Sequence, residues 1–210
     1  RMRPGELLVL FNGTGGEYEA VIESVDRRVV LVRVESFREV ERESPLNVTL
    51  AQCVSKGERM DYAVQKAVEL GVQRIVPLLS SRGVVRLDAE RWERKLAHWR
   101  GVVAAACEQS GRTRVPHVDA VQKLEAWLPS APAGTRLLLA PEGAASLRHV
   151  RAPSAPTLLV GPEGGLAEEE IEHARRYDFQ PVGLGPRVLR TETAGVAALA
   201  AMQALWGDLG

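Results

Sequence analysis

TLLVGPEGGLAEEEIEHARRYDFQPVGLGPRVLRTETA, residues Thr157 to Ala194, is the stretch that decides the fold. It begins with the short apolar run Thr157–Val160, which predicts a buried strand because it ends abruptly at a glycine-rich turn, residues 161–165. A helix is predicted from about Ala167, with glutamates in its first turn and arginines in its last. That charge order suits the helix dipole and supports the predicted helix. The stretch therefore begins with a strand, a turn and a helix.

The same order of elements follows directly in the chain. Residues 179–184 predict a second strand, Gly185-Pro186-Arg187 a second turn, and residues 191–193 the entry into a second helix. Two successive strand–turn–helix units place both turns at one edge of a parallel sheet, where open α/β folds bind their ligands. The stretch therefore predicts an α/β fold with a ligand site formed by two turns.

The first turn narrows the kind of ligand. Its glycine spacing matches neither the dinucleotide-binding pattern nor the P-loop. A pyrophosphate at this helix N-terminus would face Glu163 and the three glutamates that follow it, so the sequence favours a neutral or cationic ligand. The alternative is that the turn only connects a strand tightly to a helix.

Composition indicates a protein with a sizeable apolar core. The chain has 210 residues, of which 45% are hydrophobic, and its 27 basic side chains balance 27 acidic ones. We expect a soluble intracellular protein, since no apolar run would span a bilayer and the start has no signal-peptide pattern. Cys53 and Cys107 lack metal-type spacing, so we expect two reduced, buried thiols and no metal.

The first part of the chain alternates like antiparallel strands, and we place a small domain at residues 1–45. The predicted strands are Leu7–Phe11, Tyr18–Val25 and Val29–Val34. Three such strands make too small a core to be stable alone. The charged segment Phe37–Asn47 has no apolar period, so the second domain is placed at residues 46–210.

The second domain starts with a strand, a helix and a strand. Val48–Val54 and Arg74–Leu79 predict parallel strands, and Met60 to Val68 fill an amphipathic helical template that stops at Gly71. The helix's other face aligns a polar row, which is either a solvated face or a binding face. This row consists of Tyr62, Gln65, Lys66 and Glu69.

The remaining elements continue this alternation. We predict helices over Glu90–Ser110 and Val121–Leu128, and a strand over Arg136–Ala140 that ends in a third turn, Pro141-Glu142-Gly143, at the same sheet edge. The polar segment after the first of these helices is a phosphate contact or a capped loop. The last helix, about Thr193–Trp206, is apolar nearly all round, so both of its sides need cover and a second subunit is expected to supply part of it.

Both turns carry a family resemblance. Leu158–Gly165 and Leu184–Ala194 resemble the small-subunit ribosomal RNA methyltransferases that methylate N3 of a uridine, a family of the SPOUT class. Supporting matches are Gln65–Val72, Ser81-Arg82 and Glu108–Arg112. The resemblance implies a trefoil-knotted C-terminal α/β domain that binds S-adenosylmethionine, an N-terminal PUA-like β-barrel, and a homodimer acting on small-subunit ribosomal RNA in an assembled particle. Family members carry further strands ahead of Arg1, so we expect an incomplete barrel.

Residue roles follow from the matching positions. The cofactor would be held by Leu139, Ala140, Pro141, Glu142, Val160, Gly161, Pro162, Glu163, Gly164, Gly165, Leu184, Gly185, Val188, Leu189, Arg190 and Thr193. RNA would be contacted by Lys66, Glu69, Arg82, Gln109, Arg112 and Arg114, the arginines through phosphates.

The catalytic hypothesis rests on what N3 methylation requires. Removing the imide proton leaves negative charge on the flanking carbonyl oxygens, so a proton acceptor and a positive donor are needed. We assign Arg190 to stabilising that anion and Glu192 to positioning Arg190 or accepting the proton. Alternatively, the two side chains only hold the loop.

Three other functions stay open from the sequence. The first is an RNA-binding protein that keeps the pocket without turnover. The second is a methyltransferase for a different RNA position. The third is an α/β enzyme acting on a small phosphorylated substrate.

Overall fold

The computed structural model describes residues 2–140 and 145–210. By its internal contacts the chain divides into two compact units, one of Arg1–Glu43 with Cys107–Val115 and one of Ser44–Ala106 with Pro116–Gly210. The sequence pattern gave no sign that residues 107–115 belong to the N-terminal unit. Within the described residues, none of the helices has the length and apolar character needed to cross a membrane.

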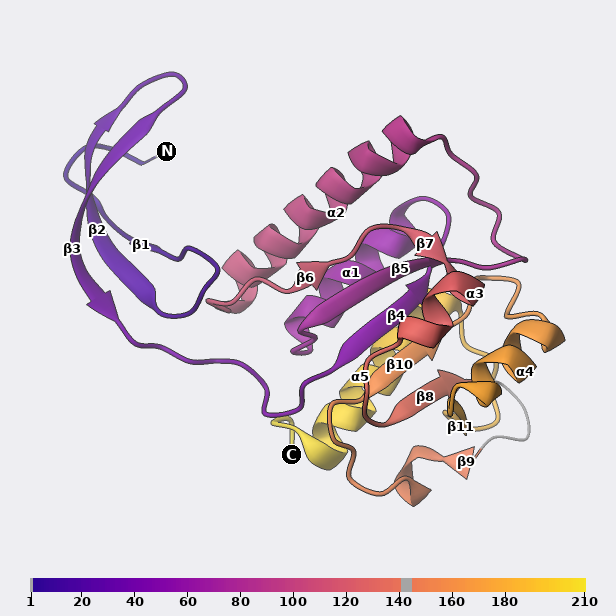
Figure 1. The fold of residues 1–210 in the computed structure, drawn as a ribbon. Helices are drawn as coiled ribbons and strands as arrows, with labels where there is room; N and C mark the ends of the chain where they lie inside the picture. Colours follow the sequence, from indigo (N-terminus) through magenta and orange to yellow (C-terminus); the bar gives the residue numbers. More distant parts are fainter. Residues whose placement is uncertain (1, 141–144) are drawn as a thin grey trace. The chain divides into compact units, whose positions relative to one another are not determined.

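The first unit is a small antiparallel sheet, in the order β1 (Leu7–Leu10), β2 (Glu17–Val25) and β3 (Val30–Arg38) (Figure 1). β3 is longer than predicted because its end stays paired with β2, with Arg38 opposite Glu17. Segment 107–115 is tied to the β1–β2 turn, since Gly15 N donates to Thr113 O at 3.1 Å. The described residues of this unit form an open three-stranded sheet, in agreement with the incomplete barrel expected from the sequence.

The second unit is built on a sheet with the strand order β6-β5-β4-β10-β8-β11-β9, in which every pairing is parallel. β7 pairs with β5 beside this path. The strands are β4 (Thr49–Cys53), β5 (Arg74–Leu79), β6 (His117–Val118), β7 (Gln122–Lys123), β8 (Arg136–Leu139), β9 (Ala145–Ser146), β10 (Thr157–Val160) and β11 (Gln180–Gly183). The predicted parallel sheet is confirmed.

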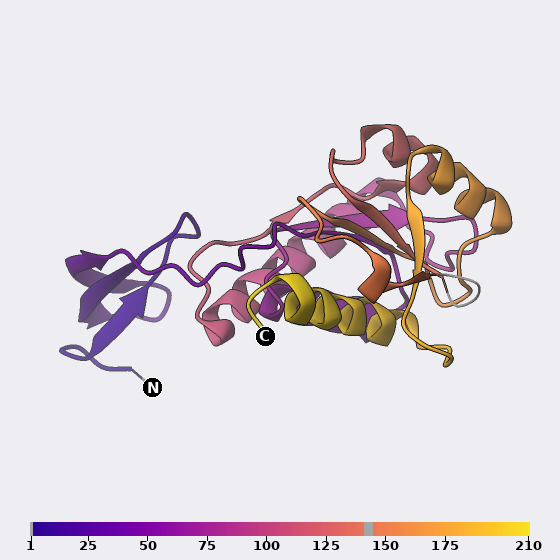
Figure 2. The same cartoon turned by 90° about the horizontal axis from the view of Figure 1, so that it is seen from below.

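Helices cover both faces of this sheet. α1 and α5 contact each other on one face, and α3 and α4 contact each other on the other (Figure 2). The helices are α1 (Glu58–Glu69), α2 (Ala89–Ser110), α3 (Leu124–Trp127), α4 (Glu168–Arg176) and α5 (Thr191–Trp206), with short 3-10 turns at Leu128–Ser130 and Leu147–His149. The helix predicted over Val121–Leu128 is shorter than expected because Gln122 and Lys123 pair with β5 instead.

Side chains of β4 alternate between the two faces, as the two-residue period of a strand requires. Ala51 and Cys53 join the cluster of buried residues beneath α3 and α4, whereas Gln52 points to α5 and hydrogen-bonds Thr191. Burial raises the pKa of the Cys53 thiol to about 12, so this cysteine is neutral and buried, as expected.

α5 has one buried and one open face. The buried face carries Gly195, Ala198, Leu199 and Met202. Thr193, Ala197, Ala200 and Ala204 follow each other on the opposite face and are exposed or half-buried. The second unit therefore covers one side of this apolar helix.

Candidate active site

A cavity of about 610 Å³ opens where the carboxyl ends of β8, β10 and β11 meet the start of α5. Both predicted turns form its walls, residues 161–166 from one side and residues 184–191 from the other. Leu139, Val160 and Val182 add apolar surface from the strand ends. The expectation that two strand–turn–helix units bring both turns to one sheet edge is confirmed.

The first turn needs glycine for its tight course. A Cβ placed on Gly161 would lie 3.2 Å from Leu166, and Gly165 has a φ of 66°, in the left-handed region that other residues avoid. Gly165 N donates to Pro162 O at 2.9 Å and closes the turn. The backbone of this turn can therefore approach a ligand closely.

A buried polar contact joins the two turns. Thr191 Oγ1 donates to Gly161 O at 2.6 Å and accepts from Gln52 Nε2 at 3.1 Å. Gln52 is fully buried, so this network fixes the start of α5 against the end of β10 without help from solvent. Gln52 was not predicted as a site residue, although a glutamine inside the apolar run of β4 is a signal that points to it.

Charged side chains meet at the rim of the cavity. Arg59, from the first turn of α1, donates to Glu163 with 3.1 Å between Nη1 and Oε1, and its Nε lies 3.9 Å from Glu192 Oε1. Burial alone would raise the pKa of Glu163, but hydrogen bonds from Lys56 N and Arg59 outweigh it and lower that pKa. Arg59 falls outside both turns and was not predicted as a site residue.

Among the described residues that line the cavity, arginines outnumber carboxylates. Arg59, Arg82, Arg187 and Arg190 line it together with Glu163 and Glu192. The glutamates of the first turn of α4 do not line it, and Glu170 instead accepts hydrogen bonds from Ser81 N and Ala167 N. Of the four glutamates that the sequence placed at this turn, only Glu163 lines the cavity, and it is paired with Arg59.

Most residues expected to hold a cofactor line this cavity. They are Leu139, Ala140, Val160, Gly161, Pro162, Glu163, Gly164, Gly165, Leu184, Gly185, Val188, Leu189 and Arg190. Pro141 and Glu142, with the third turn to which they belong, lie outside the described residues. Thr193 does not line the cavity because it lies on the open face of α5. Arg190 and Glu192 both line it, but the ion pair of Glu192 is with Arg59.

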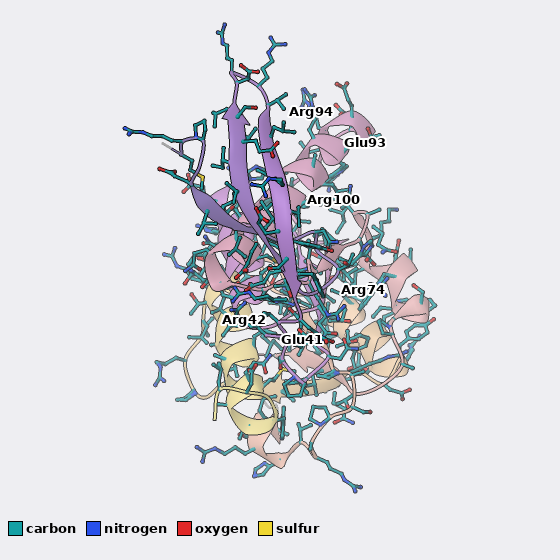
Figure 3. All side chains as sticks on the ribbon, turned by 90° about the vertical axis from the view of Figure 1, so that its left-hand side faces the viewer. Glu41, Arg42, Arg74, Glu93, Arg94 and Arg100 are labelled. Carbon is teal, nitrogen blue, oxygen red and sulfur yellow. The ribbon has the colours of Figure 1, made fainter. Side chains whose placement is uncertain are left out.

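The residues expected to contact RNA are divided between the two units. In the second unit, Arg82 lines the cavity and donates to Gly164 O at 3.3 Å, and Lys66 pairs with Glu69 at 2.7 Å. In the first unit, Gln109 is exposed, and exposed Arg114 pairs with Glu41 (labelled in Figure 3).

The structure contradicts the RNA contact that was predicted for Arg112. Its side chain is only 5% exposed, and Arg112 Nε donates to Glu43 Oε1 at 2.9 Å. A guanidinium that is buried and paired in this way is not available to a phosphate, so the predicted RNA contact of Arg112 is wrong. Its basic character in the sequence gave no sign of burial.

Comparison with known proteins defines the class. The RNA methyltransferase domain family matches residues 42–203, and the RNA methyltransferase PUA domain family matches residues 1–35. The fold class predicted from the sequence is thereby confirmed, as a parallel α/β domain that follows a small antiparallel domain of PUA type.

Individual relatives give the particular family. Ribosomal RNA small subunit methyltransferase E of Buchnera aphidicola from Schizaphis graminum is 33% identical over 100% of this chain and 86% of the relative. The enzyme of the same name from Bacillus subtilis is 32% identical over 96% and 83%. The chain belongs to the ribosomal RNA small subunit methyltransferase E family, which confirms the resemblance carried by the two turns.

Solved structures agree with this membership. A Legionella pneumophila methyltransferase in complex with the bound cofactor SAM has a TM-score of 0.97 and 44% identity, over 100% of this chain and 87% of that one. Ribosomal RNA small subunit methyltransferase E of Neisseria gonorrhoeae, bound to S-adenosyl methionine, has a TM-score of 0.93 and 42% identity over the same shares.

Proposed function

We propose that this protein transfers a methyl group from S-adenosylmethionine to N3 of a uridine in small-subunit ribosomal RNA. The observation that carries the proposal is the cavity between the two turns, which gathers a tight glycine-rich turn, an apolar wall and the Arg190–Glu192 segment in one place. Family membership supports the donor and the RNA class, and the chemistry of the lining supports the position on the base.

The residues present fit S-adenosylmethionine. The apolar strand ends Leu139, Val160 and Val182, with Leu184 and Leu189, suit the faces of an adenine ring. Glu192 Oε2 is buried without a hydrogen-bond partner among the described residues, and its acceptor capacity remains for the uridine. Backbone groups of residues 161–165 and 184–189 would hold the cofactor, which supplies an electrophilic methyl group when bound.

The chain's own residues would then manage the proton and charge of the uridine. Glu192 takes the imide proton from N3, and Arg190 donates hydrogen bonds to the carbonyl oxygen on which the negative charge develops. Arg82 and Arg187 also line the cavity, and their charges favour an anionic backbone beside the reacting base. The deprotonated nitrogen is the nucleophile that N3 methylation requires.

The proposal includes a trefoil knot and a homodimer, with a domain boundary after residue 45. The strand β10 lies between β4 and β8, and α5 returns to pack on α1 and β10, an arrangement consistent with a knotted chain. The open face of α5, which carries Ala197, Ala200 and Ala204, is the proposed dimer surface.

Ala200→Glu tests this dimer. A charge placed in a shared apolar interface would be buried without a partner, so we expect the variant to sediment as a monomer. Its melting temperature should then reflect the stability of the single chain alone. Ala198 faces the protein's own core, so Ala198→Glu would unfold the chain and is the wrong variant for this purpose. An Ala200→Glu protein that sediments like the wild type would exclude this face.

Transfer of radiolabelled methyl groups tests the activity itself. The wild-type protein is incubated with labelled S-adenosylmethionine and unmethylated small subunits or naked ribosomal RNA, and the digested nucleosides are separated by mass. Label in 3-methyluridine is the expected result. Label in another nucleoside would mean that a different RNA position is methylated. RNA binding without label would mean that the protein lacks turnover. The absence of heat in calorimetry with S-adenosylmethionine would mean that the protein acts on a different small substrate.

A further inference from the structure

Arg59 connects carboxylates from the two turns of the cavity. Glu163 belongs to the turn after β10, and Glu192 lies in the first turn of α5. Arg59 comes from neither turn, since it lies in the first turn of α1. Its Nη1 is 3.1 Å from Glu163 Oε1 and its Nε is 3.9 Å from Glu192 Oε1. One guanidinium therefore links three segments that are distant in the sequence.

The Glu163 end of this link is held firmly. Glu163 Oε1 accepts from Lys56 N at 3.0 Å as well as from Arg59. Lys56 precedes α1, so its backbone and the arginine on the helix hold the carboxylate together. A guanidinium keeps fewer orientations when one of its donors is fixed in a charge-assisted hydrogen bond. Glu163 thus serves as the anchor of Arg59.

The Glu192 end is incomplete. The Glu192 side chain is 14% exposed, and its Oε2 has no hydrogen-bond partner among the described residues. Leaving a carboxylate oxygen buried without a hydrogen-bond partner costs free energy, so this oxygen favours a bound donor. Arg59 attracts the other oxygen but does not satisfy this one. The carboxylate is therefore held from one side and retains one acceptor.

We propose that Arg59 is a positioning residue that orients the Glu192 carboxylate through its anchor on Glu163. This inference rests on the proposed function, in which Glu192 Oε2 takes the proton from N3 of the uridine. The N–H bond breaks, the O–H bond forms on Oε2, and the electron pair stays on N3 for the bond to the methyl group. Arg59 itself donates no proton to the base and acts through the Glu192 carboxylate.

The arginine fork explains why this position suits arginine. Nη1 and Nε are separate donors in one rigid plane, so a single side chain faces both carboxylates. Lysine offers one compact ammonium on a flexible stem, which supplies charge without this fixed geometry. Arg59→Lys should therefore restore only part of what Arg59→Ala removes.

Steady-state kinetics on small subunits with S-adenosylmethionine measure the effect. We expect Arg59→Ala to lower kcat about 10- to 100-fold while KM for the RNA changes less than about 3-fold, since the residue acts on the chemical step. Arg59→Lys should recover kcat in part. Arg94→Ala is the matched control, because Arg94 (Figure 3) is an exposed arginine on α2 that pairs only weakly with Glu90 at 3.5 Å. It should leave kcat unchanged.

A double-mutant cycle identifies the partner. If Arg59 acts through Glu192, Arg59→Ala should cost less than about 3-fold in a Glu192→Gln background. A full additional loss in that background, an unchanged kcat in Arg59→Ala, or equal kcat for the lysine and alanine variants would overturn the inference.

Crystal structures of the wild type and Arg59→Ala separate this inference from the proposed function. The Glu192 carboxylate should leave its place in the variant, and an unmoved carboxylate would overturn the positioning role whether or not the protein methylates RNA. A wild-type protein that transfers no methyl group to ribosomal RNA would instead refute the proposed function, and the two structures would still decide what Arg59 does.

Discussion

The two units of this protein each hold an arginine–glutamate group, and the groups differ in how completely their charges are satisfied. In the first unit, Arg112 and Glu43 are almost fully buried, with side chains 5% and 9% exposed, and both carboxylate oxygens accept from the guanidinium. In the second unit, Arg59 is 44% exposed and shared between Glu163 and Glu192. Glu192 Oε2 has no partner among the described residues.

This difference separates a structural ion pair from a site. A buried pair with its hydrogen bonds made is shielded from solvent and from a ligand, so its role is structural. A shared arginine beside a carboxylate with a free oxygen has such capacity and borders a cavity. Arginine by itself therefore predicts neither role, and the completeness of its pairing decides.

The largest effect is expected from Arg112→Ala. Removing the guanidinium leaves Glu43 buried without its cation, which should destabilise the protein by roughly 3–5 kcal/mol. Chemical denaturation of the wild type and the variant measures this difference. Arg112→Ala combined with Glu43→Leu should recover much of the loss, since both charges are then absent. A loss below about 1 kcal/mol would show that the pair is open to solvent. The Arg112–Glu43 pair would then not differ from the Arg59 group in the way described above.

The contrast between these groups explains how far the sequence could be read. Apolar periodicity predicted β10, α4, β11 and α5 and hence the edge at which the cavity lies, because these signals are local. Arg112 and Glu43 are 69 residues apart, and Arg59 and Glu163 are 104 apart, so no helical or strand spacing reveals either pair. The family motifs included Arg112, and only burial in the fold shows that this side chain is closed off.

Very short strands could not be predicted from the sequence either. β6 and β7 have two residues each, too few for a period of two to be recognised. They exist because β5 offers backbone hydrogen bonds to whichever segment passes beside it, which is a tertiary effect.

Arg190→Ala sharpens the comparison on the site side. Arg190 is exposed, lines the cavity and belongs to the second turn, so its loss should leave the fold intact. We expect methyl transfer to fall about 100-fold, close to 2.7 kcal/mol of transition-state stabilisation, with S-adenosylmethionine affinity largely kept. Single-turnover transfer, calorimetry and thermal melting make the three measurements. A joint collapse of cofactor affinity and melting temperature would make Arg190 structural, like Arg112.

Low pH should reduce the contribution of the Glu163 carboxylate to the stability of the fold. Its pKa in the folded protein is lowered from 4.5, so its ionised form stabilises the fold above that pH, and this contribution is lost as the pH falls through the lower folded value. The melting-temperature difference between the wild type and Glu163→Gln should therefore be constant near neutrality and shrink below about pH 4.5. A difference that does not change with pH would mean that the carboxylate is not held by Lys56 N and Arg59.

Arg114→Ala should have the smallest effect on stability and completes the comparison within the first unit. Arg114 and Glu41 form an ion pair at 3.0 Å in which both side chains are 53% exposed, and such pairs contribute about 0–1 kcal/mol. The guanidinium has enough exposed surface to meet a phosphate, in contrast to Arg112 two residues earlier. If it does so, the salt dependence of RNA binding should become shallower by about one unit in Arg114→Ala and stay near the wild-type slope in Arg114→Lys, which keeps the charge. Filter binding at several salt concentrations gives both slopes. An alanine variant with the wild-type slope would assign Arg114, through its bond to Thr14 O at 2.8 Å, to holding the β1–β2 turn instead.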